Sequence, residues 1–324
     1  MKLNFHCELE GRFTLRKCKL DSEGNEIAGT GEVVADWFDN MILNSGLDLI
    51  ATTWGYCNNI VVGSGTGEVL PGQTALQNQI AFSDKTQSDT RGAQIDELPY
   101  YGWRRITKRF NAGFGGGNVN ISEVGALPNA GYFNNLFSRA LVRDAMGNPT
   151  VIPILADETL DVTYEVRSYP ASSDATGTIV LKGISRDYTI RSMSMHNGGS
   201  FTQGIGEPIF ASDYDNWRFN VIANGGVGLG PITRSKNDIN NAAFPNVYSA
   251  LISTLVGGYS SGNYYRDIQT AIDLGDGNWA NGIGTIGISY GPGAFQIYFD
   301  PPPVKTNTEK FTFVTRVSWG RKVI

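Results

Sequence analysis

Three segments that lie far apart in the chain alternate between apolar and polar residues. Residues 2–9, 160–169 and 310–319 each place most of their apolar side chains on one parity, as in Leu3, Phe5, Cys7 and Leu9. A period of two residues is typical of a half-buried β-strand, and no amphipathic helical pattern extends beyond about three turns. The sequence therefore predicts a mainly β fold, with β-sandwich- or barrel-like domains, a few short helices and a closing C-terminal strand.

The high glycine content predicts many turns, and the charge balance argues against some classes of function. Glycine makes up 40 of the 324 residues, only 18% of the residues are charged, and the formal net charge is −5. Glycine adopts positive φ in tight turns, whereas a dedicated nucleic-acid-binding protein usually carries a basic excess. No apolar run approaches the ~20 residues of a membrane span, and residues 1–6 lack the apolar core of a signal peptide. We therefore expect no membrane span, no dedicated nucleic-acid binding and synthesis in the cytoplasm.

The pattern of alternating apolar and polar residues divides the chain into two parts. Alternating segments of residues 1–170 return only at 293–324, whereas residues 171–292 are dense in glycine turns. This predicts a β-rich core domain of residues 1–170 plus 293–324 and a Gly-rich inserted β unit of residues 171–292. The strand at 310–319 should complete the first core, because a lone strand leaves its backbone amides and carbonyls unpaired. Short helices are expected at 45–51, 74–79 and 247–255.

Three cysteines, Cys7, Cys18 and Cys57, and the nearby His6 are the first candidates for metal ligation. Zinc sites usually place two cysteines a few residues apart, and adjacent strand residues such as His6 and Cys7 point to opposite faces. We therefore predict buried free thiols, no metal site and no cofactor. The glycine-rich residues 63–67 lack the lysine of a phosphate-binding loop, so a turn is favoured there.

Pairs of carboxylates are the candidates for hydrolytic chemistry: Asp157/Glu158, Asp213/Asp215 and Asp273/Asp276. Glycoside hydrolases need two carboxyl groups about 5–10 Å apart, which leaves a glycan depolymerase open. These pairs lie in turn-like sequence, where aspartate usually caps backbone amides. No catalytic residue is predicted, and calcium binding by Asp273, Asp276 and Asn278 stays an alternative.

One basic cluster interrupts the low-charge sequence, at residues 103–110, Trp-Arg-Arg-Ile-Thr-Lys-Arg-Phe. A basic and aromatic strand can contact nucleic acid or an anionic glycan. The favoured interpretation is a solvated strand face whose arginines pair with acidic neighbours.

Several short motifs together resemble bacteriophage tail and fibre-associated proteins. Residues 37–47, Trp-Phe-Asp-Asn-Met-Ile-Leu-Asn-Ser-Gly-Leu, resemble a W-F-x-N-x-I-L-D-x-G-L opening, and 62–66 followed by 74–76 resemble V-G-x-G-T … T-x-L. Residues 121–125, 136–141, 157–167, 300–306 and 318–321 also resemble that group. The resemblance covers about residues 30–170 and 293–324 and implies a virion structural protein, with no catalytic residue carried over. Within it, Glu123 and Arg139 fall on neighbouring predicted strands and are expected to pair.

These observations favour a structural component of a phage virion, at the tail, collar, baseplate or base of a fibre. Low charge and many aromatics suit protein–protein interfaces, so a symmetric homo-oligomer that contacts other phage tail or neck proteins is expected. The alternative is a receptor- or glycan-binding tail fibre protein that contacts a host surface glycan through aromatic side chains. Its candidate contacts are Tyr259, Tyr264, Tyr265 and Trp279. A capsid decoration protein and a glycan depolymerase are less favoured.

Overall fold

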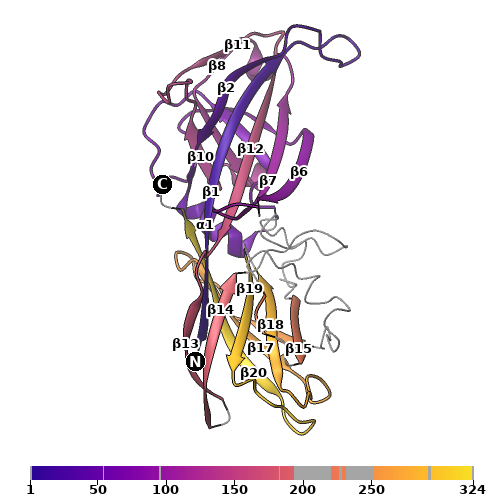
Figure 1. The fold of residues 1–324 in the computed structure, drawn as a ribbon. Helices are drawn as coiled ribbons and strands as arrows, with labels where there is room; N and C mark the ends of the chain where they lie inside the picture. Colours follow the sequence, from indigo (N-terminus) through magenta and orange to yellow (C-terminus); the bar gives the residue numbers. More distant parts are fainter. Residues whose placement is uncertain are drawn as a thin grey trace. The chain divides into compact units, whose positions relative to one another are not determined.

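Strands dominate the computed structural model of the chain (Figure 1), which confirms the predicted mainly β fold. It describes residues 2–53, 55–94, 96–181, 183–192, 220–225, 228–230, 252–290 and 293–322. In this described part no sheet closes into a barrel, and the architecture is sandwich-like.

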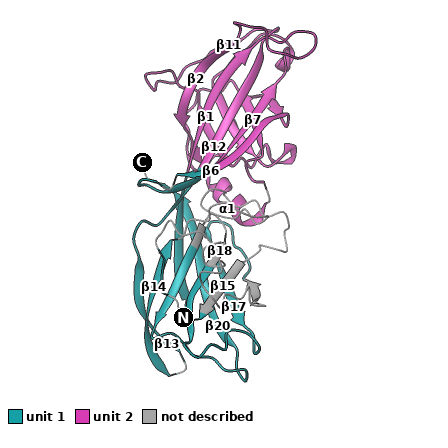
Figure 2. Cartoon of the chain, turned by 45° about the vertical axis from the view of Figure 1, so that its right-hand side comes forward, with its two compact units in different colours: residues 1–9, 92–103, 167–324 teal, residues 10–91, 104–166 magenta. Residues whose placement is uncertain are grey.

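Two compact units divide the chain (Figure 2): residues 1–9, 92–103 and 167–324 form unit 1, and residues 10–91 and 104–166 form unit 2. Four strands contribute residues to both units: β1 (Lys2–Cys18), β6 (Thr86–Gln94), β7 (Tyr101–Phe110) and β12 (Thr159–Pro170).

Unit 1 is a β-sandwich whose two sheets share one apolar core. One sheet has the order β13 (Ala175–Leu181), β14 (Ile184–Ser192), β19 (Gly293–Asp300), β18 (Ile283–Tyr290) and β15 (Asn220–Gly225). The other has the order β16 (Ile252–Val256), β17 (Tyr265–Ile272), β20 (Phe311–Arg321) and the first residues of β1. Phe5 stacks on Phe295 across the core, with ring centroids 4.3 Å apart. Alternating side chains from the facing sheets fill such a layer.

The C-terminal strand β20 is an inner strand of this sheet and not an edge strand. It runs parallel to residues 2–9 of β1 and antiparallel to β17, so both of its edges are paired. Phe311, Phe313 and Val317 are buried as the alternation predicted, and Trp319 is 2% exposed. One partner strand thus comes from the predicted core domain and the other from the segment predicted as the insert. The division into 1–170 plus 293–324 and an inserted 171–292 stays a prediction.

Unit 2 contains a separate five-stranded sheet, with the strand order β3, β10, β9, β4 and β5. Their bounds are Met41–Ile42, Ser138–Leu141, Glu123–Leu127, Asn59–Gly63 and Gln79–Ser83. The remaining parts of β1, β12, β7 and β6 pair side by side, and β2 (Glu32–Asp39) pairs antiparallel with β1. A short ladder joins β8 (Val119–Ile121) to β11 (Ile152–Ile154). The apolar core beside this five-stranded sheet includes Leu43, Val61, Leu127 and Leu136.

Helix is scarce in the described residues and one predicted helix proves correct. The helix α1 spans Asn44–Thr52, where a helix at 45–51 was predicted, and two single 3₁₀ turns lie at Phe114–Gly116 and Ala130–Tyr132. The helix predicted at 74–79 is wrong: residues 74–78 form a loop with bends, β5 begins at Gln79, and the backbone amides of Gln77 and Asn78 bond the Glu123 carboxylate. The helix predicted at 247–255 is wrong for residues 252–255, which belong to β16 and pair with β17. Residues 247–251 lie outside the described residues.

Candidate functional site

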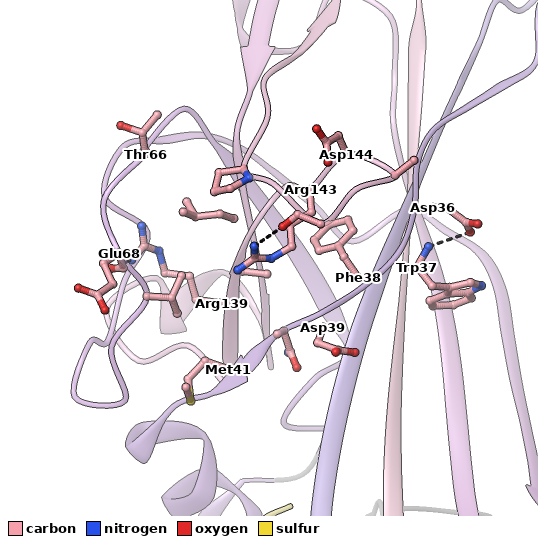
Figure 3. A pocket seen from close by; sticks show the side chains of 17 residues that line it. Asp36, Trp37, Phe38, Asp39, Met41, Thr66, Glu68, Arg139, Arg143 and Asp144 are labelled. Atoms are coloured by element: carbon pink, nitrogen blue, oxygen red, sulfur yellow. Dashed lines mark hydrogen bonds between the residues drawn. The ribbon is translucent and has the colours of Figure 1, made fainter. Parts of the chain in front are cut away.

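A pocket of about 1020 Å³ in unit 2 (Figure 3) brings together three segments that are remote in sequence. We call it the β2–β10 pocket. It is lined by residues 36–41 from β2 and β3, residues 66, 68 and 69 from the loop after β4, and residues 139–141, 143–145, 147 and 149 from β10 and the following turn. The motifs of residues 37–47, 62–66 and 136–141 therefore meet at one place. Sequence reasoning identified these motifs but did not predict that they form a pocket.

The β2 wall of the pocket is held by side chains from neighbouring strands. The guanidinium carbons of Arg12 and Arg105 lie 4.3 Å and 5.0 Å from the centroid of the Trp37 ring. Both arginines also bond Glu165, with Arg12 Nε 2.8 Å from Oε1 and Arg105 Nη2 2.5 Å from Oε2. Asp36 Oδ1 accepts the Trp37 backbone N–H at 2.8 Å. These contacts fix the indole of Trp37 at the rim of the pocket.

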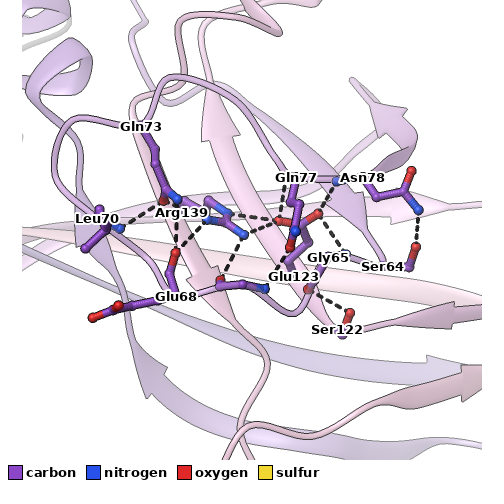
Figure 4. Close-up of polar contacts among 11 residues, drawn as sticks. Ser64, Gly65, Glu68, Leu70, Gln73, Gln77, Asn78, Ser122, Glu123 and Arg139 are labelled. Carbon is purple, nitrogen blue, oxygen red and sulfur yellow. Dashed lines mark hydrogen bonds and ion pairs between the residues drawn. The ribbon is translucent and has the colours of Figure 1, made fainter.

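The wall formed by the 63–78 loop is anchored on a buried ion pair (Figure 4). Arg139 Nε and Nη2 lie 2.9 Å and 2.8 Å from Glu123 Oε2, and the two side chains are 1% and 0% exposed. Glu123 and Arg139 come from the adjacent strands β9 and β10, so the predicted cross-strand pair is confirmed. A carboxylate this deeply buried is stable only when its acceptor sites are filled.

Backbone amides of the loop fill the remaining acceptor sites of Glu123. Oε1 accepts the N–H groups of Gly65 at 2.9 Å and Asn78 at 2.7 Å, and Oε2 accepts that of Gln77 at 3.0 Å. A side chain at residue 65 would collide with the same carboxylate and with Gln77 Cβ, which explains a glycine there. The glycine-rich loop is thus wrapped around a protein carboxylate, in place of the phosphate that such loops hold elsewhere.

Arg139 uses its outer nitrogens to hold the far side of the loop. Nη1 donates to Gln73 Oε1 at 2.6 Å and to the Glu68 carbonyl at 3.3 Å, and Nη2 donates to the Gly67 carbonyl at 3.3 Å. One guanidinium therefore spans from the strand core to the rim, and it positions Glu68 and its neighbours along the pocket.

Carboxylates dominate the rim of the pocket. Asp36, Asp39, Glu68 and Asp144 line it and are exposed, and none of the four forms an ion pair within the described residues. Asp144 Oδ1 accepts the N–H groups of Met146 and Asn148, at 2.9 Å each, and the Asn148 bond is the main reason why the pKa of Asp144 is lowered. Arg143 Nη1 donates to the Gly147 carbonyl at 2.5 Å. The pocket is therefore acidic, with the charge of Arg139 compensated from beneath by Glu123.

Chemically, the pocket can receive cationic and hydrogen-bonding groups.

In the described part of the chain no three His, Cys, Asp or Glu side chains come together as a metal-ligand set. The cysteines lie elsewhere, and all three are free and buried. Burial raises the pKa of both Cys7 and Cys57 to about 12. The exposed His6 and the buried Cys7 point to opposite faces of β1, as predicted.

Three of the carboxylates considered for hydrolysis, Asp157, Glu158 and Asp273, form ion pairs. Asp157 lies 2.6 Å from Lys19 Nζ, and Glu158 lies 3.1 Å from Lys17 Nζ. In the candidate calcium group, Asp273 pairs with Lys310 at 2.5 Å, and Asn278 Oδ1 accepts Lys305 Nζ at 2.9 Å. Asp213 and Asp215 lie outside the described residues.

The arginines of the β7 basic cluster pair with carboxylates, as the favoured interpretation predicted, but a solvated face is wrong for Arg104 and Lys108, which are 6% and 5% exposed. The three arginines pair as Arg104 with Asp89 at 2.7 Å, Arg105 with Glu165 at 2.5 Å and Arg109 with Asp161 at 2.6 Å. These arginines contribute to cross-strand ion pairs on the sheet.

Three of the four aromatic residues proposed to contact a glycan lie near the end of β20, but Tyr259 and Tyr265 contact opposite faces of that strand, through Trp319 and Arg316. In unit 1, the Tyr259 ring stacks 6.2 Å from that of Trp319, the Tyr264 carbonyl accepts the Trp319 N–H at 2.9 Å, and Tyr265 lies opposite Ser318. Tyr264 adopts a left-handed backbone with φ of 49°, and Arg316 covers the Tyr265 ring at 3.6 Å. Trp279 is not part of this group, because it packs against the sandwich core.

Comparison with protein-family models, curated proteins and solved structures finds no match to this chain. Among the described residues, no helix has the length and apolar character needed to cross a membrane.

Proposed function

We propose that this chain is a structural component of a bacteriophage virion, a tail, collar, baseplate or fibre-base adaptor that acts through protein–protein interfaces. The observation that carries the proposal is the meeting of three motif segments around the Glu123–Arg139 ion pair. The ion pair fixes a loop on its inner side, and the outer side of the same loop lines the β2–β10 pocket.

The character of the pocket favours binding over catalysis. Its walls are held by bonds within the protein, including the Glu123 carboxylate and the paired arginines around Trp37. Rigid, pre-organised surfaces lose little conformational entropy when a partner docks, which suits a subunit that assembles with others. We include in the proposal a symmetric homo-oligomer, since closed symmetry is the usual arrangement of such subunits.

Co-purification with phage particles tests the proposal. Particles produced from the genome that encodes this chain should contain it after density-gradient purification, and gold-labelled antibodies should mark one fixed position on them. Deletion of the gene should give particles that lack that position. Particles that contain no copy of the chain would refute the proposed function. Light scattering of the isolated protein and of extracted tail complexes tests the oligomer separately.

Glycan binding is the second candidate, and the backbone of Tyr264 favours it. A bulky residue at positive φ costs about 1–3 kcal/mol and is often found at functional sites. With φ of 49°, Tyr264 lies between Tyr259 and Tyr265 in sequence and beside Trp319. Tyr264→Gly removes the ring and relieves the backbone strain, so it should weaken binding of host surface polysaccharide without loss of stability. Equal binding by the wild type and this variant would contradict a glycan site here.

A further inference from the structure

The β2–β10 pocket lies where two strands each have an edge without a neighbouring strand. The short β3 pairs only with Ser138 and Arg139 of β10. Ala140 and Leu141 pair with β9 on the other edge and, among the described residues, have no strand beside them on the β3 side. Both residues line the pocket.

The register of β10 shows which backbone groups face this gap. Leu43 N–H donates to the Phe137 carbonyl on the β3 side, at 3.0 Å, whereas Val142 N–H donates to the Ser122 carbonyl on the β9 side, at 2.9 Å. Successive residues of an antiparallel strand bond in alternate directions. Leu141 therefore directs its N–H and carbonyl away from β9, into the pocket.

The strand β2, on the opposite wall, also directs backbone groups away from its partner strand. Asn40 N–H donates to the Gly11 carbonyl of β1 at 3.1 Å, and Asp39 lies opposite Arg12 in the next position of the register. By alternation, the backbone groups of Asp39 point away from β1. The pocket therefore presents a strand edge from each of two sheets, with the Asp39 carboxylate on one of them.

Charge complementarity identifies the occupant that suits these edges. The rim carries the carboxylates of Asp36, Asp39, Glu68 and Asp144 against the single uncompensated guanidinium of Arg143. Half-buried apolar side chains, Met41 and Val69, lie among these charges. Open backbone groups take up an extended peptide, in which main-chain hydrogen bonds give affinity and alternate side chains give specificity.

We propose that the β2–β10 pocket docks an extended, positively charged segment of a partner protein, which adds as a short strand beside Leu141 and places lysine or arginine side chains near Asp39 and Glu68. The proposal rests on the proposed function as an interface-forming subunit. It extends that function by naming the site and the chemistry of the partner.

Peptide binding to the full chain tests whether the β2–β10 pocket docks a basic strand. The probes are three fluorescein-labelled octapeptides: (Lys-Val)₄, the charge-reversed (Glu-Val)₄, and (Lys-Pro)₄, whose prolines cannot donate backbone hydrogen bonds. The pocket variant combines Asp39→Asn with Glu68→Gln, two lining residues whose carboxylates form no ion pair within the described residues. The matched control combines Asp96→Asn with Glu97→Gln, two exposed carboxylates outside the pocket.

We expect (Lys-Val)₄ to bind the wild type and the control equally, and to bind the pocket variant about tenfold more weakly, in fluorescence anisotropy at roughly 0.15 M salt. The other two peptides should bind at least about tenfold more weakly than (Lys-Val)₄. No binding of (Lys-Val)₄ below about 1 mM, or equal losses in the pocket variant and the control, overturns the proposal.

Two further outcomes would assign the pocket differently and also overturn the proposal. Equal binding of (Lys-Pro)₄ would indicate a site for cationic side chains without strand addition. Self-association that the pocket variant abolishes would identify the occupant as a second copy of the chain. The co-purification experiment remains independent, because particles can contain the chain whether or not this pocket binds a basic strand.

Discussion

Replacing Arg139 by methionine tests whether the buried ion pair holds unit 2 together. The substitution keeps the length of the side chain but leaves the Glu123 carboxylate, which is 0% exposed, without its cation. Removing one partner of a buried pair typically costs about 3–5 kcal/mol. Three backbone N–H groups still bond Glu123, so we expect the lower end, a loss of about 3 kcal/mol in the free energy of unfolding.

Urea unfolding, followed by both far-UV circular dichroism and tryptophan fluorescence, measures this loss by linear extrapolation. The matched control is Arg143→Met, since Arg143 is half-buried and donates to the Gly147 carbonyl. The control should lose less than about 1 kcal/mol. An Arg139→Met protein that loses no more than the control would refute the idea that the ion pair fixes the loop.

The double substitution Glu123→Gln with Arg139→Met separates the pair from its surroundings. If the two groups act mainly on each other, the double variant should be more stable than the sum of the single losses predicts, by about 2 kcal/mol. Strict additivity would mean that each side chain stabilises the loop independently.

Three further predictions concern other contacts. Arg316 is the main reason why the pKa of Asp267 is lowered from 3.8 to about 2. This carboxylate therefore stabilises the fold above about pH 4, and its contribution is lost as the pH falls through 2. In urea titrations between these pH values, the free energy of unfolding of Asp267→Asn should fall less steeply with decreasing pH than that of the wild type. Burial raises the pKa of Cys57 to about 12, so a disulfide reagent should leave this thiol unmodified in the native protein at about pH 8 and modify it in urea. Gly65→Ala should destabilise the protein by about 1–3 kcal/mol through overpacking, whereas Gly72→Ala, with nothing within 4 Å of the added carbon, should change the midpoint little.

Strands with a clear alternation could be predicted from the sequence because their burial is one-sided. In β1, the buried residues from Leu3 to Leu9 fall on every second position, and the same holds for β20. The strand β6, with the sequence Thr-Gln-Ser-Asp-Thr-Arg-Gly-Ala-Gln, could not be predicted, since it is mostly exposed and carries no apolar alternation. Its strand conformation depends on pairing with β7, which is a tertiary effect.

The candidate site was predictable only in its parts. The Glu123–Arg139 pair could be predicted because two charged residues fell on neighbouring predicted strands. The helix predicted at 74–79 failed because the amides of Gln77 and Asn78 bond a carboxylate about 45 residues away in sequence, where no local pattern indicates it. The pocket depends on how β3 ends after two paired residues, and that follows from packing rather than from any motif.

A buried carboxylate suits this loop better than an apolar anchor would. Residues 63–78 include four glycines and several polar residues, and Leu76 is the one residue of this loop in the buried core cluster of unit 2, so most of the loop has no side chain in that core. It offers backbone amides instead, and a carboxylate can accept from several of them at once. Glu123 gathers amides from both ends of the loop, at Gly65 and at Gln77 and Asn78, while Arg139 bonds its middle. The pocket wall is therefore formed before any partner arrives, and a docking strand would have to lose only its own conformational freedom.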